Sequence, residues 1–266
     1  MTALARRDAI AARFARAVAR YDDHADVQRH AASTLAARIA ALPLPLRPRV
    51  LEIGCGTGLL TAALARHIAA ADWTITDIAP EMVAATRLAA DTGRIDLTGT
   101  AHYACLDGEH PDGSHVGQYD LVCSSLAVQW FNDLPAGLQR LAACLAPGGT
   151  LAVSTLTADT FKEWRDAHRH FDLRAATPDY PDAGTLARAL PGHAGSVTID
   201  PQRVRFADGL GFVRSLKGIG ATLPREGARA LRPSDFRRVL SRFTDDGATV
   251  TYEIAYGVWQ RAGDAS

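Results

Sequence analysis

The stretch that decides the fold reads Val50-Leu51-Glu52-Ile53-Gly54-Cys55-Gly56-Thr57-Gly58. A short apolar run with one acid leads into three alternate glycines, and a largely apolar segment, Leu59 to Ala65, follows at once. This order predicts a buried strand, a tight turn and a helix. Glycine suits such a turn because it adopts positive φ and lets a ligand approach the backbone closely. We therefore expect a nucleotide-like ligand at the carboxyl end of this strand.

A second apolar run ends in an acid, and the sequence separation between this acid and the glycines is informative. Trp73-Thr74-Ile75-Thr76 is followed by Asp77, nineteen residues after Gly58. Rossmann-like units place the acid that binds a ribose about this far beyond the glycine loop. Asp77 also suits the cap of a helix that begins near Pro80, and the two roles are compatible. An ordinary strand-to-helix turn is the alternative for the glycines, and the acid makes that alternative the weaker one.

The spacing of the glycines separates two kinds of nucleotide site. Dinucleotide-binding loops usually read G-x-G-x-x-G, whereas this loop reads E-x-G-x-G-x-G. It resembles the first motif of class I S-adenosylmethionine (SAM) methyltransferases. The resemblance implies SAM as the cofactor and S-adenosylhomocysteine (SAH) as its product. The cofactor contacts that it implies are Glu52, Gly54, Cys55, Gly56, Gly58, Asp77, Ile78, Met82, Asp107 and Ser124. A plain turn residue is an equal alternative for Asp107, because Gly108 follows it.

Composition limits the classes of protein to consider. A chain of 266 residues can bury one large α/β core. A formal net charge of zero argues against a protein that coats nucleic acid or an anionic membrane. The four cysteines form no C-x-x-C pair, and no His cluster has ligand spacing, so we expect no metal. No apolar run is long enough for a secretory leader or a membrane span, which predicts a cytoplasmic protein.

Apolar patterns of strand and helix type alternate from Val50 onward. The expected strands are 50–53, 73–77, 99–105, 119–124, 150–156, about 197–206 and 250–259. The expected helices between them are 58–68, 80–90, 135–145, 159–171 and 182–190, with Pro147-Gly148-Gly149 as a turn before the strand at 150. Such alternation predicts an α/β fold of Rossmann-like type: a seven-stranded, mostly parallel sheet with helices on both faces and an antiparallel C-terminal hairpin.

The ends of the pattern differ from its centre. Helical spacing of apolar residues before residue 41, ended by three nearby prolines, predicts N-terminal helices. Two further helical pieces interrupt the closing hairpin. We expect one domain over 1–266, divided into an N-terminal helical lid (1–45), a core (46–206), a helical substrate insertion (207–245) and a final strand (246–266).

Two segments outside the glycine loop carry polar and aromatic side chains suited to chemistry. The N-terminal stretch 14–29 is more polar and aromatic than a packing helix requires, which favours a lid that excludes water. An amphipathic helix resting on the sheet edge is the alternative. The fourth strand runs into Ser124–Trp130, where the transferred methyl group would point if SAM is bound. Trp130 as an ordinary core residue is an equal alternative.

The insertion contains two cations beside a glycine-rich turn. Arg214 and Lys217 are three residues apart and so share one face of the expected helix. A guanidinium beside an ammonium makes a good clamp for a carboxylate. A solvated helix face is the alternative.

Three motifs together extend the resemblance to a single family. They are F-x-R-A-x-x-x-Y-x-x-H-A-D-x-Q-R at Phe14–Arg29, S-L-A-V-Q-W at Ser125–Trp130 and R-S-L-K-G-I-G-A-T at Arg214–Thr222. The chain resembles malonyl-acyl-carrier-protein O-methyltransferases along nearly its whole length. The resemblance implies SAM-dependent methylation of the free carboxylate of a malonyl thioester, in biotin synthesis, with malonyl-acyl carrier protein or malonyl coenzyme A as the substrate. The catalytic residues that it implies are Tyr21, His24, Gln129, Trp130, Arg214 and Lys217.

Two other functions remain open from sequence. One is methylation of a small free polycarboxylate of the trans-aconitate kind, and the other is a non-methylating assembly factor with the same fold. An acidic carrier protein is favoured by the arginines of the C-terminal region, although a solvated arginine-rich face is a strong alternative. These arginines are Arg225, Arg229, Arg232, Arg237, Arg238 and Arg242.

Overall fold

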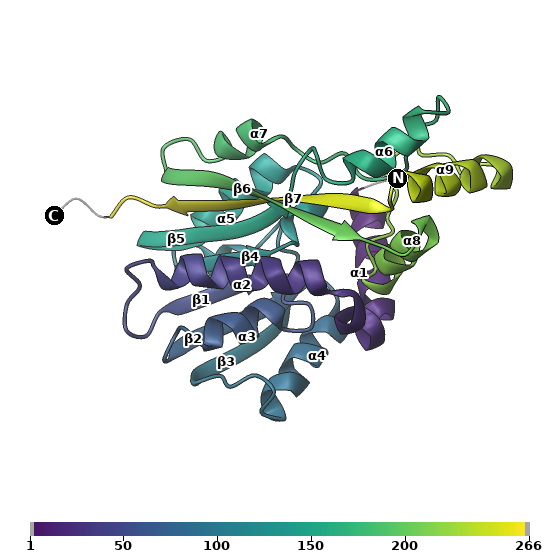
Figure 1. Ribbon diagram of the computed structural model, residues 1–266. Helices are drawn as coiled ribbons and strands as arrows, with labels where there is room; N and C mark the ends of the chain where they lie inside the picture. Colours follow the sequence, from purple (N-terminus) through teal and green to yellow (C-terminus); the bar gives the residue numbers. More distant parts are fainter. Residues whose placement is uncertain (1–2, 264–266) are drawn as a thin grey trace.

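A computed structural model describes residues 3–263 and contains one seven-stranded sheet (Figure 1). The strands are β1 (Arg49–Ile53), β2 (Ala71–Asp77), β3 (Gly99–Cys105), β4 (Tyr119–Ser125), β5 (Leu145–Leu156), β6 (Ala194–Arg205) and β7 (Thr249–Gln260). Their spatial order is β3-β2-β1-β4-β5-β7-β6, and β7 is antiparallel to both of its neighbours. The predicted mostly parallel sheet and its antiparallel closing hairpin are confirmed.

Helices fill the connections between the strands. They are α1 (Ala3–Tyr21), α2 (Asp26–Ala40), α3 (Leu59–Ala65), α4 (Pro80–Asp91), α5 (Leu134–Ala143), α6 (Lys162–Arg169), α7 (Ala183–Ala187), α8 (Gly209–Gly218) and α9 (Pro233–Asp245). Single 3-10 turns are η1 (Asp22–His24), η2 (Gly113–His115) and η3 (Val128–Trp130). Among these, no helix is both long and apolar enough to cross a membrane, as judged over residues 3–263.

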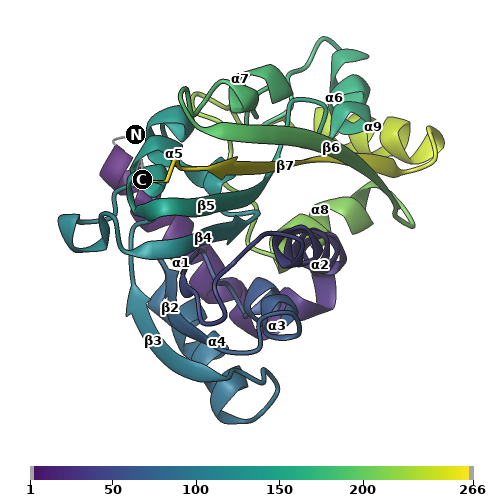
Figure 2. The same ribbon diagram turned by 90° about the vertical axis from the view of Figure 1, so that its left-hand side faces the viewer.

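The sheet has an apolar core on each face. On one face, α2 and α3 pack Leu35, Ile39 and Leu64 against the strands. On the other, α5 and α7 contribute Leu138 and Leu186 to a second buried cluster. Figure 2 shows α2 and α3 on one side of the strands and α5 on the other. The predicted helical layers on both faces are therefore confirmed, and burial of both faces explains why the central strands are almost continuously apolar.

One local prediction is wrong. Pro147-Gly148-Gly149 does not form a turn before the strand but lies inside β5. Leu145 pairs with Tyr119 and Thr150 pairs with Leu121, so the segment between them is an irregularity in an otherwise continuous pairing. Gly148 has φ +77°, which lets the backbone bulge out without ending the strand. The helix expected over 135–145 consequently ends earlier, at Ala143.

The insertion between β6 and β7 contains α8 and α9, and α8 packs against the N-terminal elements. A Cβ at Gly218 would lie 2.0 Å from the His24 ring, and a Cβ at Gly220 would lie 3.0 Å from the carbonyl oxygen of Arg13. The glycines of this predicted motif therefore permit close approach of α8 to η1 and α1. The division of the chain into lid, core and insertion stays a prediction, and its outermost residues, 1–2 and 264–266, lie outside the described residues.

Candidate active site

The glycine loop joins β1 to α3 at the point where the strand order reverses. Gly54, Gly56 and Gly58 all have positive φ, at +70°, +56° and +91°. Asp77 at the end of β2 accepts a hydrogen bond from the Gly56 amide at 2.9 Å. Its other oxygen accepts from the Ala79 amide at 2.9 Å, just before α4. Asp77 thus supports the loop and the start of α4 together, and burial raises its carboxyl pKa.

A cavity lies above this loop, at the crevice where open α/β sheets bind ligands. It is lined by Arg7, Ile10, Phe14, Tyr21, Ile53, Gly54, Gly56, Asp77, Ile78, Met82, Leu106, Asp107, Gly108, Glu109, Ser125, Leu126, Ala127, Trp130, Phe131 and Asn132. Six of the ten predicted cofactor contacts line this cavity: Gly54, Gly56, Asp77, Ile78, Met82 and Asp107. Cys55 lines a smaller adjoining hollow together with Tyr21 and Ser125.

The three positions of the loop require glycine for different reasons. Nothing lies within 4 Å of a Cβ built at Gly56, so a side chain there would occupy cavity space. A Cβ at Gly54 would lie 2.4 Å from the Ala127 Cβ, and one at Gly58 would lie 2.5 Å from Ile95. Gly56 therefore keeps the cavity open, which fits a ligand held against the backbone, while the other two allow the chain to pack.

Two predicted cofactor contacts are buried away from the cavity. Glu52 accepts a hydrogen bond from the Thr61 hydroxyl at 2.7 Å, and burial raises its carboxyl pKa to about 7. Ser124 is fully buried, and neither its hydroxyl nor Glu52 Oε1 has a hydrogen-bond partner among the described residues. Ser125 lines the cavity in place of Ser124. Neighbouring residues of a strand point to opposite faces, so a shift of one residue reverses the assignment.

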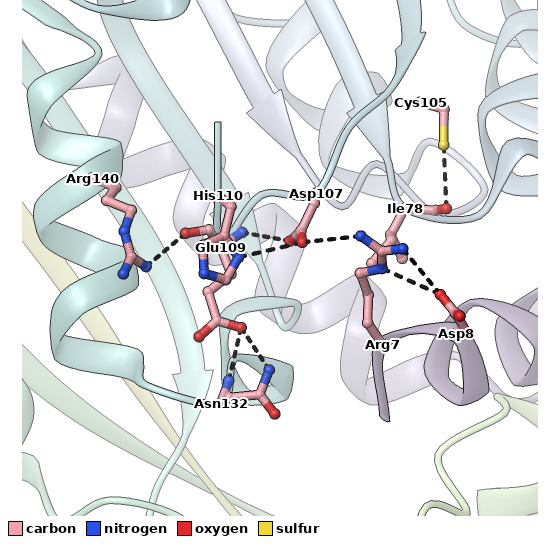
Figure 3. A network of polar contacts seen from close by, with 9 residues as sticks. All are labelled: Arg7, Asp8, Ile78, Cys105, Asp107, Glu109, His110, Asn132 and Arg140. Atoms are coloured by element: carbon pink, nitrogen blue, oxygen red, sulfur yellow. Dashed lines mark hydrogen bonds and ion pairs between the residues drawn. The ribbon is translucent and has the colours of Figure 1, made fainter. Parts of the chain in front are cut away.

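Helix α1 covers the cavity with one face. This cavity face consists of Arg7, Ile10, Phe14 and Tyr21, whose spacing places them along one side of a helix. Arg7 lies 3.8 Å from the Asp107 carboxylate, in the loop after β3 (Figure 3). The Phe14 ring meets the Trp130 ring edge-on, with centroids 5.7 Å apart.

The turn after α1 is tied to the glycine loop. The Thr57 hydroxyl donates a hydrogen bond of 2.7 Å to Asp22 of η1. Just before it, Tyr21 lines the cavity, and burial together with the charges of Asp77 and Asp22 raises the pKa of its hydroxyl far above the usual range. With the contacts of Arg7 and Phe14, α1 and η1 thereby touch the loops that follow β1, β3 and β4.

The loop after β4 contains a strained residue that faces the cavity. Leu126 has φ +49°, a backbone conformation that residues other than glycine rarely adopt. The Gln129 side-chain amide donates a hydrogen bond of 2.7 Å to the Leu126 carbonyl. Predicted catalytic residue Gln129 is not among the residues that line the cavity, and its side chain instead holds this turn. Trp130 lines the cavity directly.

Sequence reasoning missed an acid that organises the far end of the cavity. Glu109 is buried and accepts hydrogen bonds from the backbone and side-chain nitrogens of Asn132, at 2.9 and 3.0 Å, and from the Asp133 amide at 2.8 Å. Figure 3 shows Glu109 and Asp107 side by side in one network that reaches Arg7 and Arg140. No local motif marks Glu109 or Arg7, because their partners come from distant segments.

Besides Gln129, three predicted catalytic residues lie outside the cavity. His24 packs its ring against Gly218 of α8. Lys217 lines a separate open groove with Arg13 and Arg16, and Arg214 is exposed on α8. The structure therefore brings Tyr21 and Trp130 together at the cavity but not the two cations of the insertion. Within residues 3–263, no group of three His, Cys, Asp or Glu side chains is placed to hold a metal ion.

The comparisons with solved structures agree with the fold. The YcgJ protein from Bacillus subtilis has a TM-score of 0.60 and 12% identity, covering 88% of this chain and 99% of its own. A phosphoethanolamine N-methyltransferase 2 from Haemonchus contortus, solved in complex with S-adenosylhomocysteine, has a TM-score of 0.52 and 12% identity. The match covers 86% of this chain and 52% of that chain.

Sequence comparisons are more specific. A family described as Methyltransferase domain matches residues 26–195. A malonyl-acyl-carrier-protein O-methyltransferase from Magnetococcus marinus is 40% identical over 92% of this chain and 89% of its own. One from Enterobacter lignolyticus is 37% identical over 96% and 98%. The biotin biosynthesis bifunctional protein BioCD from Bordetella avium is 54% identical over 95% of this chain, which spans 52% of that longer protein.

The sheet order, the glycine loop and the family match define a class I methyltransferase. Within that class, relatives of similar length match over nearly the whole chain. The chain belongs to the malonyl-acyl-carrier-protein O-methyltransferase family.

Proposed function

We propose that this protein transfers a methyl group from SAM to the free carboxylate of malonyl-acyl carrier protein, giving the methyl ester used in biotin synthesis. The observation that carries the proposal is the cavity between the glycine loop and α1, found in a chain 40% identical to a malonyl-acyl-carrier-protein O-methyltransferase. The match covers 89% of that relative's own length. The Bordetella relative is named for biotin biosynthesis.

The lining residues suit SAM. The backbone at Gly54 and Gly56 would hold the amino-acid part, the Asp77 carboxylate would accept hydrogen bonds from the ribose, and Asp107 would lie toward the base. Ile78 and Met82 would supply apolar contacts to the base. When bound, SAM supplies an electrophilic methyl group on a sulfonium.

The chain's own residues would align the acceptor and exclude water. A malonyl carboxylate is already ionised at neutral pH, so no general base is needed. Alignment of reacting groups can contribute roughly 7 to 11 kcal/mol in well-oriented systems. A tyrosine hydroxyl is protonated at neutral pH, and the raised pKa of Tyr21 keeps it so, which would let it donate a hydrogen bond to the carboxylate. Phe14 and Trp130 form an apolar part of the cavity wall.

The position of the two insertion cations argues against them as the partners of the substrate carboxylate. Arg214 and Lys217 do not line the cavity. We therefore assign the malonyl carboxylate to Tyr21, which lines the cavity, and place His24 and the cations of α8 outside the reacting centre.

Transfer of labelled methyl from SAM tests the proposal. Malonyl-acyl carrier protein should become labelled in a form that mild base releases, as an ester does. Succinyl-acyl carrier protein and malonyl methyl ester thioester should gain little or no label, since one misplaces the carboxylate and the other lacks it. Label on free trans-aconitate with none on any malonyl thioester would overturn the proposal, as would SAH binding without transfer to any acceptor.

A further inference from the structure

An open groove on the other side of α1 is lined by three cations. We call it the basic groove, and its residues are Ala9, Ala12, Arg13, Arg16, Ala17, Lys217, Gly220 and Thr222. Among the described residues that line it, none is acidic. Because the whole chain has a formal net charge of zero, this concentration of positive charge is local.

The cations of the basic groove are free to bind an anion. Within residues 3–263, neither arginine nor Lys217 forms an ion pair with an acid. Arg7, on the same helix, contrasts with them because it contacts both Asp8 and Asp107. Cations placed side by side repel one another unless an anion neutralises them.

The groove is built by close packing of two helices. Gly220 has φ +74° and brings the end of α8 against α1, where a Cβ would lie 3.3 Å from the Ala17 Cβ. This contact places Lys217 on the same groove as Arg13 and Arg16. Ala9 and Ala12 leave room between the cations, and Thr222 adds a hydroxyl.

We propose that the basic groove binds the phosphate of the pantetheine arm on which the malonyl group is carried. This inference rests on the proposed function, because the arm belongs to the malonyl thioester. Arginine binds phosphate oxygens in a bidentate manner, and lysine adds a compact positive charge. A carrier protein and coenzyme A both present this phosphate, so the shared chemistry is a phosphate on pantetheine.

The length of the arm is compatible with this placement. The chain from phosphate to thioester sulfur is equivalent to about four residues of extended backbone, or roughly 13 to 14 Å. An α-helix with its side chains is about 10 to 12 Å across. The arm is thus comparable in length with the width of the helix that separates the basic groove from the cavity.

Binding of the unacylated arm tests the inference without any need for activity. By calorimetry, the unmodified protein should bind 4′-phosphopantetheine at least about tenfold more tightly than pantetheine, and added salt should reduce the difference. The variant Arg13→Ala/Lys217→Ala should lose the difference while its SAH affinity and thermal midpoint are maintained. Arg94→Ala removes an exposed cation outside the groove and should leave the difference intact.

Kinetics then separate the sources of the phosphate. The KM values for malonyl-acyl carrier protein and malonyl coenzyme A should each rise about tenfold in the double variant, and that for malonyl-pantetheine should not change. Equal binding of phosphopantetheine and pantetheine to the unmodified protein would overturn the inference. So would a KM effect confined to the carrier protein, which would assign the groove to the acidic protein surface instead. Absence of methyl transfer to any malonyl thioester refutes the proposed function alone, because the calorimetric result stands apart from it.

Discussion

Helix α1 has two sides, of which one lines the cavity and the other lines the basic groove. Its cavity face places Phe14 against Trp130 and Arg7 beside Asp107, so its side chains have partners in the loops of the sheet. The side toward α8 presents Arg13 and Arg16, which have no acidic partner among residues 3–263. The contrast suits two roles: paired side chains hold the helix against the cavity, and unpaired cations suit the anion proposed for the basic groove.

The largest effect is expected at the floor of the cavity. Gly56→Val should reduce SAH affinity by at least roughly a hundredfold, because its side chain would fill cavity space and because φ +56° disfavours a β-branched residue. Gly93→Val is a matched control, since Gly93 also has positive φ, at +73°, with nothing near its Cβ, but does not line the cavity. Calorimetry should show near-normal affinity for the control. Normal affinity in Gly56→Val would remove the glycine loop from the cofactor site.

A second prediction separates residues that line the cavity from one buried behind it. In the folded protein the pKa of Glu52 is raised to about 7 from an ordinary 4.5. Between these values the unfolded chain loses its proton and the folded protein keeps it, so stability falls as pH rises through this window and levels off above it. Glu52→Gln cannot ionise and lacks this contribution.

Chemical denaturation of both proteins measures the effect. Relative to Glu52→Gln, the unmodified protein should lose roughly 2 kcal/mol of unfolding free energy between about pH 5 and about pH 8. Titrations shared by the two proteins cancel in the difference. A constant difference across this range would show that Glu52 is ionised in the folded protein.

The smallest effects are expected for two neighbouring residues of α1 that face different hollows. Phe14→Ala should weaken SAH binding by about 1 kcal/mol, because it removes the ring that meets Trp130 above the cavity. Arg13→Ala, one residue away, should leave SAH affinity unchanged because Arg13 lines the basic groove. Calorimetry with SAH on the two single variants measures both affinities. Equal losses would mean that α1 acts as one undivided wall.

Local patterns were enough to predict the fold and the floor of the site. The glycine spacing and Asp77 placed the cavity because strand, turn and helix follow one another directly in the chain. The i, i+3 spacing of Arg214 and Lys217 could show only that they share a helix face. It could not show that this face lies beside α1, since that depends on packing around Gly218 and Gly220.

Other parts of the site depend on contacts between distant segments. Arg7 lies beside Asp107, and Glu109 holds Asn132, across long stretches of chain that no short motif encodes. Ser124 was predicted to face the cofactor, but Ser125 faces the cavity, because register along a strand is set by pairing with its neighbours. The bulge at Pro147–Gly149 cannot be predicted from sequence for a similar reason, because the pairing of β5 with β4 depends on the whole sheet.

If the cavity face of α1 closes over the cofactor, amide hydrogen exchange with and without SAH should show it. We expect slower exchange in α1 and η1, together with the glycine loop, because ligand would join these elements through Tyr21 and Thr57. Slower exchange in the glycine loop with unchanged exchange over residues 7–24 would contradict the claim, since the cofactor would then bind without contact from α1.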